Sequence, residues 1–167
     1  VRIEETKCCQ IAVGHAPRAV QQASHGPMHQ SVHQQRSESA DDQGGDGAQH
    51  DGLPVTADVT AHHLFLTEMD IGFFDSQCHV QPPLRTQRDR DGLRAALQRG
   101  TINAICSDHQ PHDRDAKLAP FPSSEPGISG LETLLPLTLR LVDDGVLNLS
   151  QGIARLTQGP ADIIGRN

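Results

Sequence analysis

Residues 101–112 read Thr-Ile-Asn-Ala-Ile-Cys-Ser-Asp-His-Gln-Pro-His, and this stretch decides the fold that the chain is expected to adopt. The apolar run 102–106 has the length and composition of a buried strand. It stops at a polar group that contains Asp108, His109 and His112. In barrels and doubly wound sheets of parallel strands, side chains at the carboxyl ends of the strands face the active site. An acid placed there is a candidate catalytic or metal-binding residue.

Apolar residues are distributed unevenly along the 167 residues. Residues 1–52 contain no Leu and no aromatic residue, whereas Leu and Ile are frequent from Leu53 onward. Low hydrophobicity with high polarity predicts disorder, so we expect residues 1–50 to be a low-complexity polar segment that is disordered or frame-shifted. Translating the encoding DNA in its other two frames tests the second possibility. The core is expected in residues 51–167, which are long enough for one domain.

The charge pattern and the cysteines restrict the partners. The formal net charge is −7, and the Arg residues between Arg85 and Asp91 are interleaved with Asp. Nucleic-acid binding needs clustered basic side chains, and a membrane span needs ~18 consecutive apolar residues; neither pattern is found in this sequence. The cysteines lack Cys-x-x-Cys spacing, which favours a reduced, cytoplasmic setting. We therefore expect a small-molecule substrate, no nucleic acid and no membrane.

Strands and helices are predicted to alternate after Leu53. Strands are expected at 53–61, 77–81 and 102–106, and helices at 89–99, at 130–142 and from a Ser150 cap to about Thr157. A long Pro-rich loop fills the stretch 111–127. This order is typical of an α/β fold with parallel strands. Three strands cannot close an eight-stranded barrel, so the sequence predicts part of a barrel or a small open sheet.

Candidate site residues stand at the ends of the expected strands. His62 and His63 follow the first strand and Asp108 follows the third. Imidazole and carboxylate ligands from separate strand ends are typical of zinc hydrolases, although a core role for the histidines and a turn-capping role for Asp108 are open alternatives. Arg85 can clamp a carboxylate or pair with a nearby aspartate. Backbone N–H groups of the loop 125–130, which precedes a helix, can bind an anion or form an ordinary turn.

Four motifs in this order resemble the dihydroorotases of the cyclic amidohydrolase superfamily. They are Gly52–Thr67, Pro82–Arg85, Ile105–His112 and Pro126–Leu137. The resemblance implies the C-terminal part of a TIM (β/α)8 barrel of the metal-dependent amidohydrolase type. It implies the interconversion of N-carbamoyl-L-aspartate and L-dihydroorotate in pyrimidine biosynthesis, with a binuclear zinc site in the complete family member.

The resemblance also implies roles for individual residues. By position, His62 and Asp108 correspond to zinc ligands, and Asp108 corresponds to the catalytic proton carrier. The implied substrate contacts are Gln81, Arg85, Gln110 and His112. Gln81 and Gln110 replace a common Asn and a common Ala of the family, which can alter substrate fit. The family's His-x-His motif has no counterpart in these 167 residues, so we expect the chain to be inactive on its own.

Two other functions fit the same resemblance. The family includes non-catalytic dihydroorotase-like subunits that scaffold aspartate transcarbamoylase, which makes that enzyme a candidate partner. Hydantoinases and allantoinases use the same metal chemistry on other cyclic amides, although Pro82–Arg85 favours dihydroorotase. A complete N-terminal sequence discriminates the first two functions, because an intact His-x-His motif favours the enzyme and its absence favours the scaffold.

Overall fold

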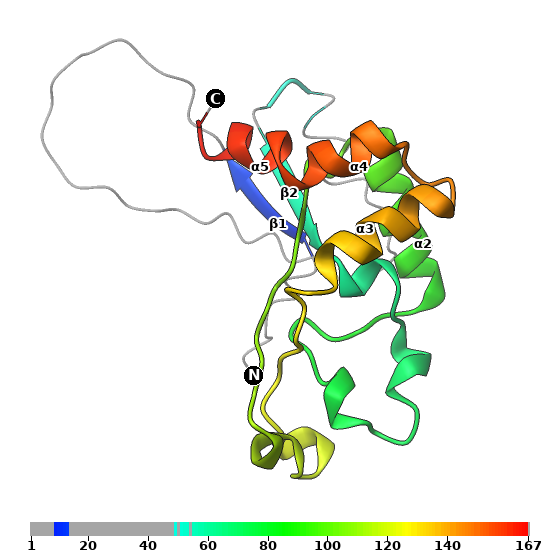
Figure 1. Ribbon diagram of the computed structural model, residues 1–167, viewed down its shortest axis with the longest axis vertical. Coiled ribbons are helices and arrows are strands. Elements are labelled where there is room, and N and C mark those ends of the chain that lie inside the picture. The colour runs from blue at the N-terminus through cyan, green and yellow to red at the C-terminus, as the bar shows by residue number, and fades with distance from the viewer. Residues whose placement is uncertain (1–8, 14–48, 50, 54, 167) are drawn as a thin grey trace, which may run out of the picture.

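The part of the chain that the computed structural model describes comprises residues 9–13, 49, 51–53 and 55–166. Its sheet has the strand order β1-β2-β3 (Figure 1). Strand β2 (Val55–Thr60) pairs in parallel with β3 (Ala104–Cys106), which sets Thr60 opposite Cys106. The predicted strands at 53–61 and 102–106 are confirmed, with shorter bounds. Because the two strands are parallel, their carboxyl ends lie at the same edge of the sheet.

Strand β1 (Cys9–Val13) pairs with β2 in antiparallel orientation, with Cys9 opposite Val59. The predicted parallel pairing is found between β2 and β3, and β1 adds an antiparallel strand at the other edge of β2. The pairing gives hydrogen-bond partners to the backbone N–H and C=O groups on the edge of β2 that faces away from β3. The rest of the segment 1–50, except Gln49, lies outside the described residues. The three strands of the described part form an open sheet and not a closed barrel.

The stretch 77–81 does not form the predicted strand. Residues Ser76–Cys78 make a 3-10 helix, whose first turn is held by the Asp75 carboxylate accepting from the Gln77 N–H at 2.9 Å. Because β2 pairs directly with β3, no place is left between them for another strand. The long loop that follows β3 contains two further 3-10 helices, Arg114–Lys117 and Phe121–Ser123. Figure 1 shows both loop regions extending together away from the helices.

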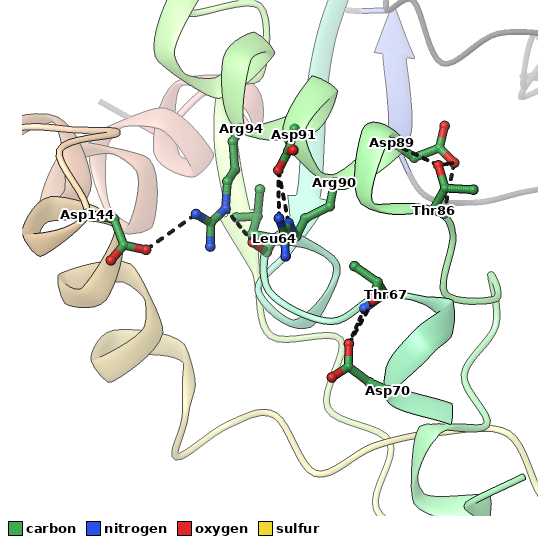
Figure 2. Close-up of polar contacts among 9 residues, drawn as sticks. All are labelled: Leu64, Thr67, Asp70, Thr86, Asp89, Arg90, Asp91, Arg94 and Asp144. Atoms are coloured by element: carbon green, nitrogen blue, oxygen red, sulfur yellow. Dashed lines mark hydrogen bonds and ion pairs between the residues drawn. The ribbon is translucent and has the colours of Figure 1, made fainter. Parts of the chain in front are cut away.

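Four α-helices complete the described fold. They are α2 (Gln87–Arg99), α3 (Leu134–Asp143), α4 (Leu149–Leu156) and α5 (Gln158–Ile163). Helix α2 begins two residues before the predicted start, because Thr86 caps it in a reciprocal box with Asp89 (Figure 2). The predicted Ser150 cap of α4 is wrong. The side chain of Asn148 accepts from the Gln151 N–H at 2.8 Å and starts the helix earlier.

The apolar core lies between the sheet and the helices. Its fully buried members include Val59, Leu64, Leu97, Ile102 and Leu141. Among the described residues, no helix has the length and apolar character that crossing a bilayer requires.

Arg94 of α2 fastens the turn that follows β2. Its Nε donates to the Leu64 carbonyl at 2.7 Å, and its guanidinium lies 3.3 Å from the Asp144 carboxylate (Figure 2). The guanidinium also lies over the Phe65 ring, 4.8 Å from the centroid. These contacts hold the turn against α2 and the end of α3. They thereby fix the position of the two histidines that open this turn.

Candidate active site at the ends of β2 and β3

The two histidines that follow β2 are both buried, but their surroundings differ. They start a 3-10 helix, His62–Leu64, at the carboxyl end of the strand. The His63 ring is held through Nδ1 by the Thr60 hydroxyl and through Nε2 by the Pro82 carbonyl at 3.1 Å. Neither ring nitrogen of His62 has a hydrogen-bond partner in the described part of the chain. His63 is therefore structural, whereas a buried imidazole without a partner indicates an interaction that the described residues do not supply.

His62 lines a cavity of about 190 Å³ between the strand ends and α3. The segment between β3 and α3 contributes Ser107, Ile128, Ser129 and Gly130 to its lining. Phe65, Leu66 and Leu137 make much of the rest, so the surroundings are mainly apolar. A cavity of ~150 Å³ is large enough for benzene, so this one has room for a small ring.

Asp108 is the second residue after β3 and lies in the left-handed backbone region, with φ 43°. Asp tolerates this region better than most residues because its short polar side chain can bond locally. Its carboxylate is half-buried and accepts from the Gln110 side chain at 3.3 Å. The structure thus brings together two of the predicted site residues, Asp108 and Gln110.

Asp58 and Cys106 form a pair beside Asp108 that sequence patterns did not single out. Burial raises the pKa of Asp58, against the effect of a hydrogen bond to Cys106. Burial and then the Asp58 charge raise the pKa of Cys106 to about 12, so the thiol stays protonated and is no nucleophile at neutral pH. Strand alternation puts Asp58 on the face of Thr60, which lies opposite Cys106. That alternation was the signal available in the sequence.

The other predicted substrate contacts have partners of their own or stand at the surface. Arg85 is exposed, and its Nε lies 3.6 Å from the Asp89 carboxylate. It thus forms an ion pair with a nearby aspartate, which was one of the two roles predicted for it. His112 donates from Nε2 to the Pro126 carbonyl at 3.0 Å. Gln81 is exposed and follows the buried Val80.

The described residues do not complete a zinc site. His62 and Asp108 follow neighbouring strands and have side chains that suit zinc, and the partnerless ring of His62 fits a ligand role. A zinc ion takes three or four protein ligands. In the described ranges, however, no three His, Cys, Asp or Glu side chains gather as a metal site.

Of the two alternatives left open for the loop 125–130, an anion site and an ordinary turn, the contacts at its helix-proximal end favour the turn. The backbone N–H groups of Gly130 and Leu131 both donate to Nδ1 of His109, each at 3.1 Å. These two N–H groups therefore have an imidazole nitrogen as their acceptor.

Acidification is expected to destabilise the metal-free chain through His62. Burial, with a smaller contribution from neighbouring His63, lowers the pKa of His62 from 6.5 to about 4. Between these two pH values the unfolded state takes up a proton that the folded state does not. Stability is therefore unaffected above about pH 6.5, falls as the pH drops towards 4, and levels off below it. We expect a loss of up to about 3 kcal/mol.

The measurement is urea unfolding at a series of pH values, with His62→Gln as the control. The variant lacks this titration but keeps His63, Asp58 and every other ionisable group. The free energy of unfolding of the unmutated chain should fall more steeply on acidification than that of the variant. Parallel curves for the two proteins would show that His62 is not held neutral by burial.

Known proteins are similar to this chain in sequence and in fold. No family model matches the chain. A dihydroorotase-like protein of Pseudomonas putida is 61% identical over 114 residues, which are 68% of this chain and 27% of that protein. A dihydroorotase-like protein of Pseudomonas aeruginosa is 55% identical over 70% of this chain and 28% of its own length. A dihydroorotase of Syntrophotalea carbinolica is 47% identical over 66% of this chain and 26% of its own length. The chain spans about a quarter of the length of the curated relatives it matches.

Solved structures share the fold. The L-hydantoinase of Arthrobacter aurescens superposes with a TM-score of 0.68 at 27% identity, covering 76% of this chain and 30% of that one. The dihydroorotase of Saccharomyces cerevisiae, solved with 5-fluoroorotic acid, has a TM-score of 0.61 at 21% identity, covering 72% and 34%. The described fold is that of part of a cyclic amidohydrolase.

Proposed function

We propose that this chain, about two thirds of which is a dihydroorotase-family sequence, forms the C-terminal barrel part of a cyclic amidohydrolase of the dihydroorotase type. The complete protein would interconvert N-carbamoyl-L-aspartate and L-dihydroorotate, a reaction of pyrimidine biosynthesis in the cytoplasm. The described residues would supply one side of its active site, at the carboxyl ends of β2 and β3. Barrel closure would require strands beyond the three described here.

One observation carries this proposal: His62 is buried with both ring nitrogens unpartnered, and it lines a cavity with the turn that begins at Ser107. A group bound in that cavity would satisfy the imidazole. We assign His62 and Asp108 as zinc ligands whose remaining partners come from outside the described residues. The Asp108 carboxylate, held by Gln110, would accept and return the substrate proton.

Arg85 and His112 are proposed to contact the substrate carboxylates. The ion pair of Arg85 with Asp89 does not prevent this, because Arg85 is largely exposed and such pairs contribute only about 0–1 kcal/mol. A bidentate bond to a substrate carboxylate is stronger and can replace it. Gln81, which precedes Pro82 at the surface of the same region, is proposed as a further contact.

A non-catalytic role has specific support. The two Pseudomonas relatives are named dihydroorotase-like and not dihydroorotase. In this second candidate function the chain would scaffold aspartate transcarbamoylase. The hydantoinase alternative has weaker support, because the identity to an L-hydantoinase is 27% whereas the identity to a dihydroorotase reaches 47%.

Activity and zinc binding of the purified chain test the proposal together. We expect no zinc-dependent turnover of dihydroorotate by the chain alone, because the ligand set is incomplete. Weak zinc binding should remain, and either His62→Ala or Asp108→Ala should lower its affinity at least about tenfold, as loss of a metal-site residue commonly does. The matched control is Asp113→Ala, which removes an exposed carboxylate nearby and should leave zinc affinity unchanged.

Two results would overturn the assignment. Equal zinc affinity in the unmutated chain, His62→Ala and Asp108→Ala would remove both residues from the metal site. Turnover above background in a chelator-controlled assay would show that the chain completes the site itself. Size-exclusion chromatography with aspartate transcarbamoylase tests the scaffold function, which requires the two proteins to elute together.

A further inference from the structure

We propose that His109 is a positioning residue of the candidate active site. Its Nδ1 atom holds in place the cavity wall formed by Ile128, Ser129 and Gly130, which we call the 128–130 wall. The proposal rests on the proposed function only in treating the cavity as the substrate site. His109 does not line the cavity itself, so it acts through the backbone of the wall.

The hydrogen bonds of His109 fix its tautomer. The N–H groups of Gly130 and Leu131 both point their donors at Nδ1, at 3.1 Å each. A nitrogen that accepts two hydrogen bonds carries no proton, so the proton of the neutral ring is on Nε2. The two donors lie in the turn that precedes α3, and His109 is the acceptor for both of them.

The same two segments are joined by further backbone contacts. The Gln110 N–H donates to the Ile128 carbonyl at 3.0 Å, and His109 and Ile128 form a parallel β-bridge. Two residues after Ile128, a Cβ atom added to Gly130 would overlap the carbonyl oxygen of Ser107. The segments 107–112 and 126–131 therefore lie in close contact. The side chain of His109 joins them at Gly130 and Leu131 by accepting hydrogen bonds from both backbone N–H groups.

This arrangement sets the shape of the cavity. On one side the cavity is lined by Ser107 and the 128–130 wall, which belong to the two contacting segments. On the other side it is lined by His62, at the end of β2. Without an acceptor at Nδ1, the Gly130 and Leu131 donors would turn towards water and the wall would shift away from Ser107. The residue thus determines how a ring bound beside His62 would be enclosed.

The test compares His109→Asn with His109→Gln in the 15N-labelled full chain at pH 7. An Asn side chain places its oxygen close to the position of Nδ1, whereas Gln reaches the position of Nε2. Hydrogen exchange of the Gly130 and Leu131 amides should stay within about twofold of the unmutated chain in the Asn variant. It should accelerate about tenfold in the Gln variant and in His109→Ala, because the acceptor is lost. Equal exchange in the Asn and Gln variants would overturn the proposal.

Two measurements separate this proposal from the proposed function. A long-range 1H–15N spectrum of the unmutated chain should show Nδ1 of His109 unprotonated, and a protonated Nδ1 would overturn the positioning role without any variant. Titration with L-dihydroorotate should shift the amides of the 128–130 wall in the unmutated and Asn chains but not in the Gln chain. An absence of shifts in all chains, with the exchange difference intact, would overturn the assignment of this cavity as the substrate site and leave the positioning role supported.

Discussion

Replacing Lys117 with Met is expected to lower the free energy of unfolding by about 4 kcal/mol. Lys117 is buried in the loop after β3, and its ammonium group, which has three N–H donors, lies within 3.5 Å of four backbone carbonyl oxygens. The acceptors are Glu125 and Gly127 at 2.7 Å, Ser76 at 3.1 Å and His79 at 3.5 Å. Methionine keeps the length and the apolar stem of the side chain but offers no donor. Four carbonyls turned towards the same point would then lose their shared donor.

The consequence extends beyond the loop that contains Lys117. Burial lowers the pKa of Lys117, and the nearby Asp75 charge acts in the opposite direction. Two of its acceptors, Ser76 and His79, lie in the connection between β2 and α2, and the other two lie in the loop after β3. One ammonium group therefore joins these two loop regions. We therefore expect the variant to loosen both regions together.

Chemical unfolding of the two purified proteins measures this effect. The matched control is Arg114→Met, which removes a cation from the same 3-10 helix at an exposed position and should change stability by less than about 0.5 kcal/mol. If the Lys117 and Arg114 variants lost the same stability, the carbonyl cluster would not be what holds these loops together.

Replacing Gly127 with Ala is expected to cost about 4 kcal/mol as well. Gly127 has φ 149°, which L-residues with a side chain rarely adopt. An added Cβ would overlap the Gln110 carbonyl oxygen and would lie 2.9 Å from Nε2 of His112. The Gly127 N–H donates to the His79 carbonyl at 2.8 Å, so the backbone cannot move aside without losing that bond. Both the strain and the overlap therefore apply.

Gly72→Ala separates these two contributions. Gly72 also has a positive φ, 54°, but nothing lies within 4 Å of an added Cβ. We expect this control to cost about 1 kcal/mol, the strain alone. Equal destabilisation by the two substitutions would mean that the loop moves freely away from Gln110. Amide spectra of the Gly127 variant should also show shifts at His112, whose ring the new methyl group would contact.

The candidate site was predictable in its residue types and in its place. His62 and Asp108 end an apolar strand each, and parallel pairing brings those ends to one edge of the sheet. The strand at 77–81 was not predictable in the same way. Its composition suits a strand, but the Asp75 cap and the direct pairing of β2 with β3 leave it as a turn. Local composition does not state which strands become neighbours.

Two residues show why the remaining contacts could not be read from the sequence. Lys117 stands in a polar, Pro-rich loop, where a solvated side chain is the ordinary expectation. It is nevertheless buried among carbonyls that include Ser76, 41 residues before it, and Gly127, 10 residues after it. His109 stands beside Asp108 and looks like part of a ligand cluster, yet its Nδ1 is occupied by two backbone donors. Hydrogen-bond partners of this kind come from segments that only the tertiary fold brings together.

The sequence by itself determined the family resemblance, the parallel pair of strands and the residues that end them. These follow from local composition and from motifs whose order is kept along the chain. Only the tertiary structure decided that His63 is structural while His62 lacks a partner, and that an imidazole holds the amides before α3. Adjacent residues of one type carry the same local signal. Their roles separate only when residues distant in sequence come within hydrogen-bonding distance of one ring and not of the other.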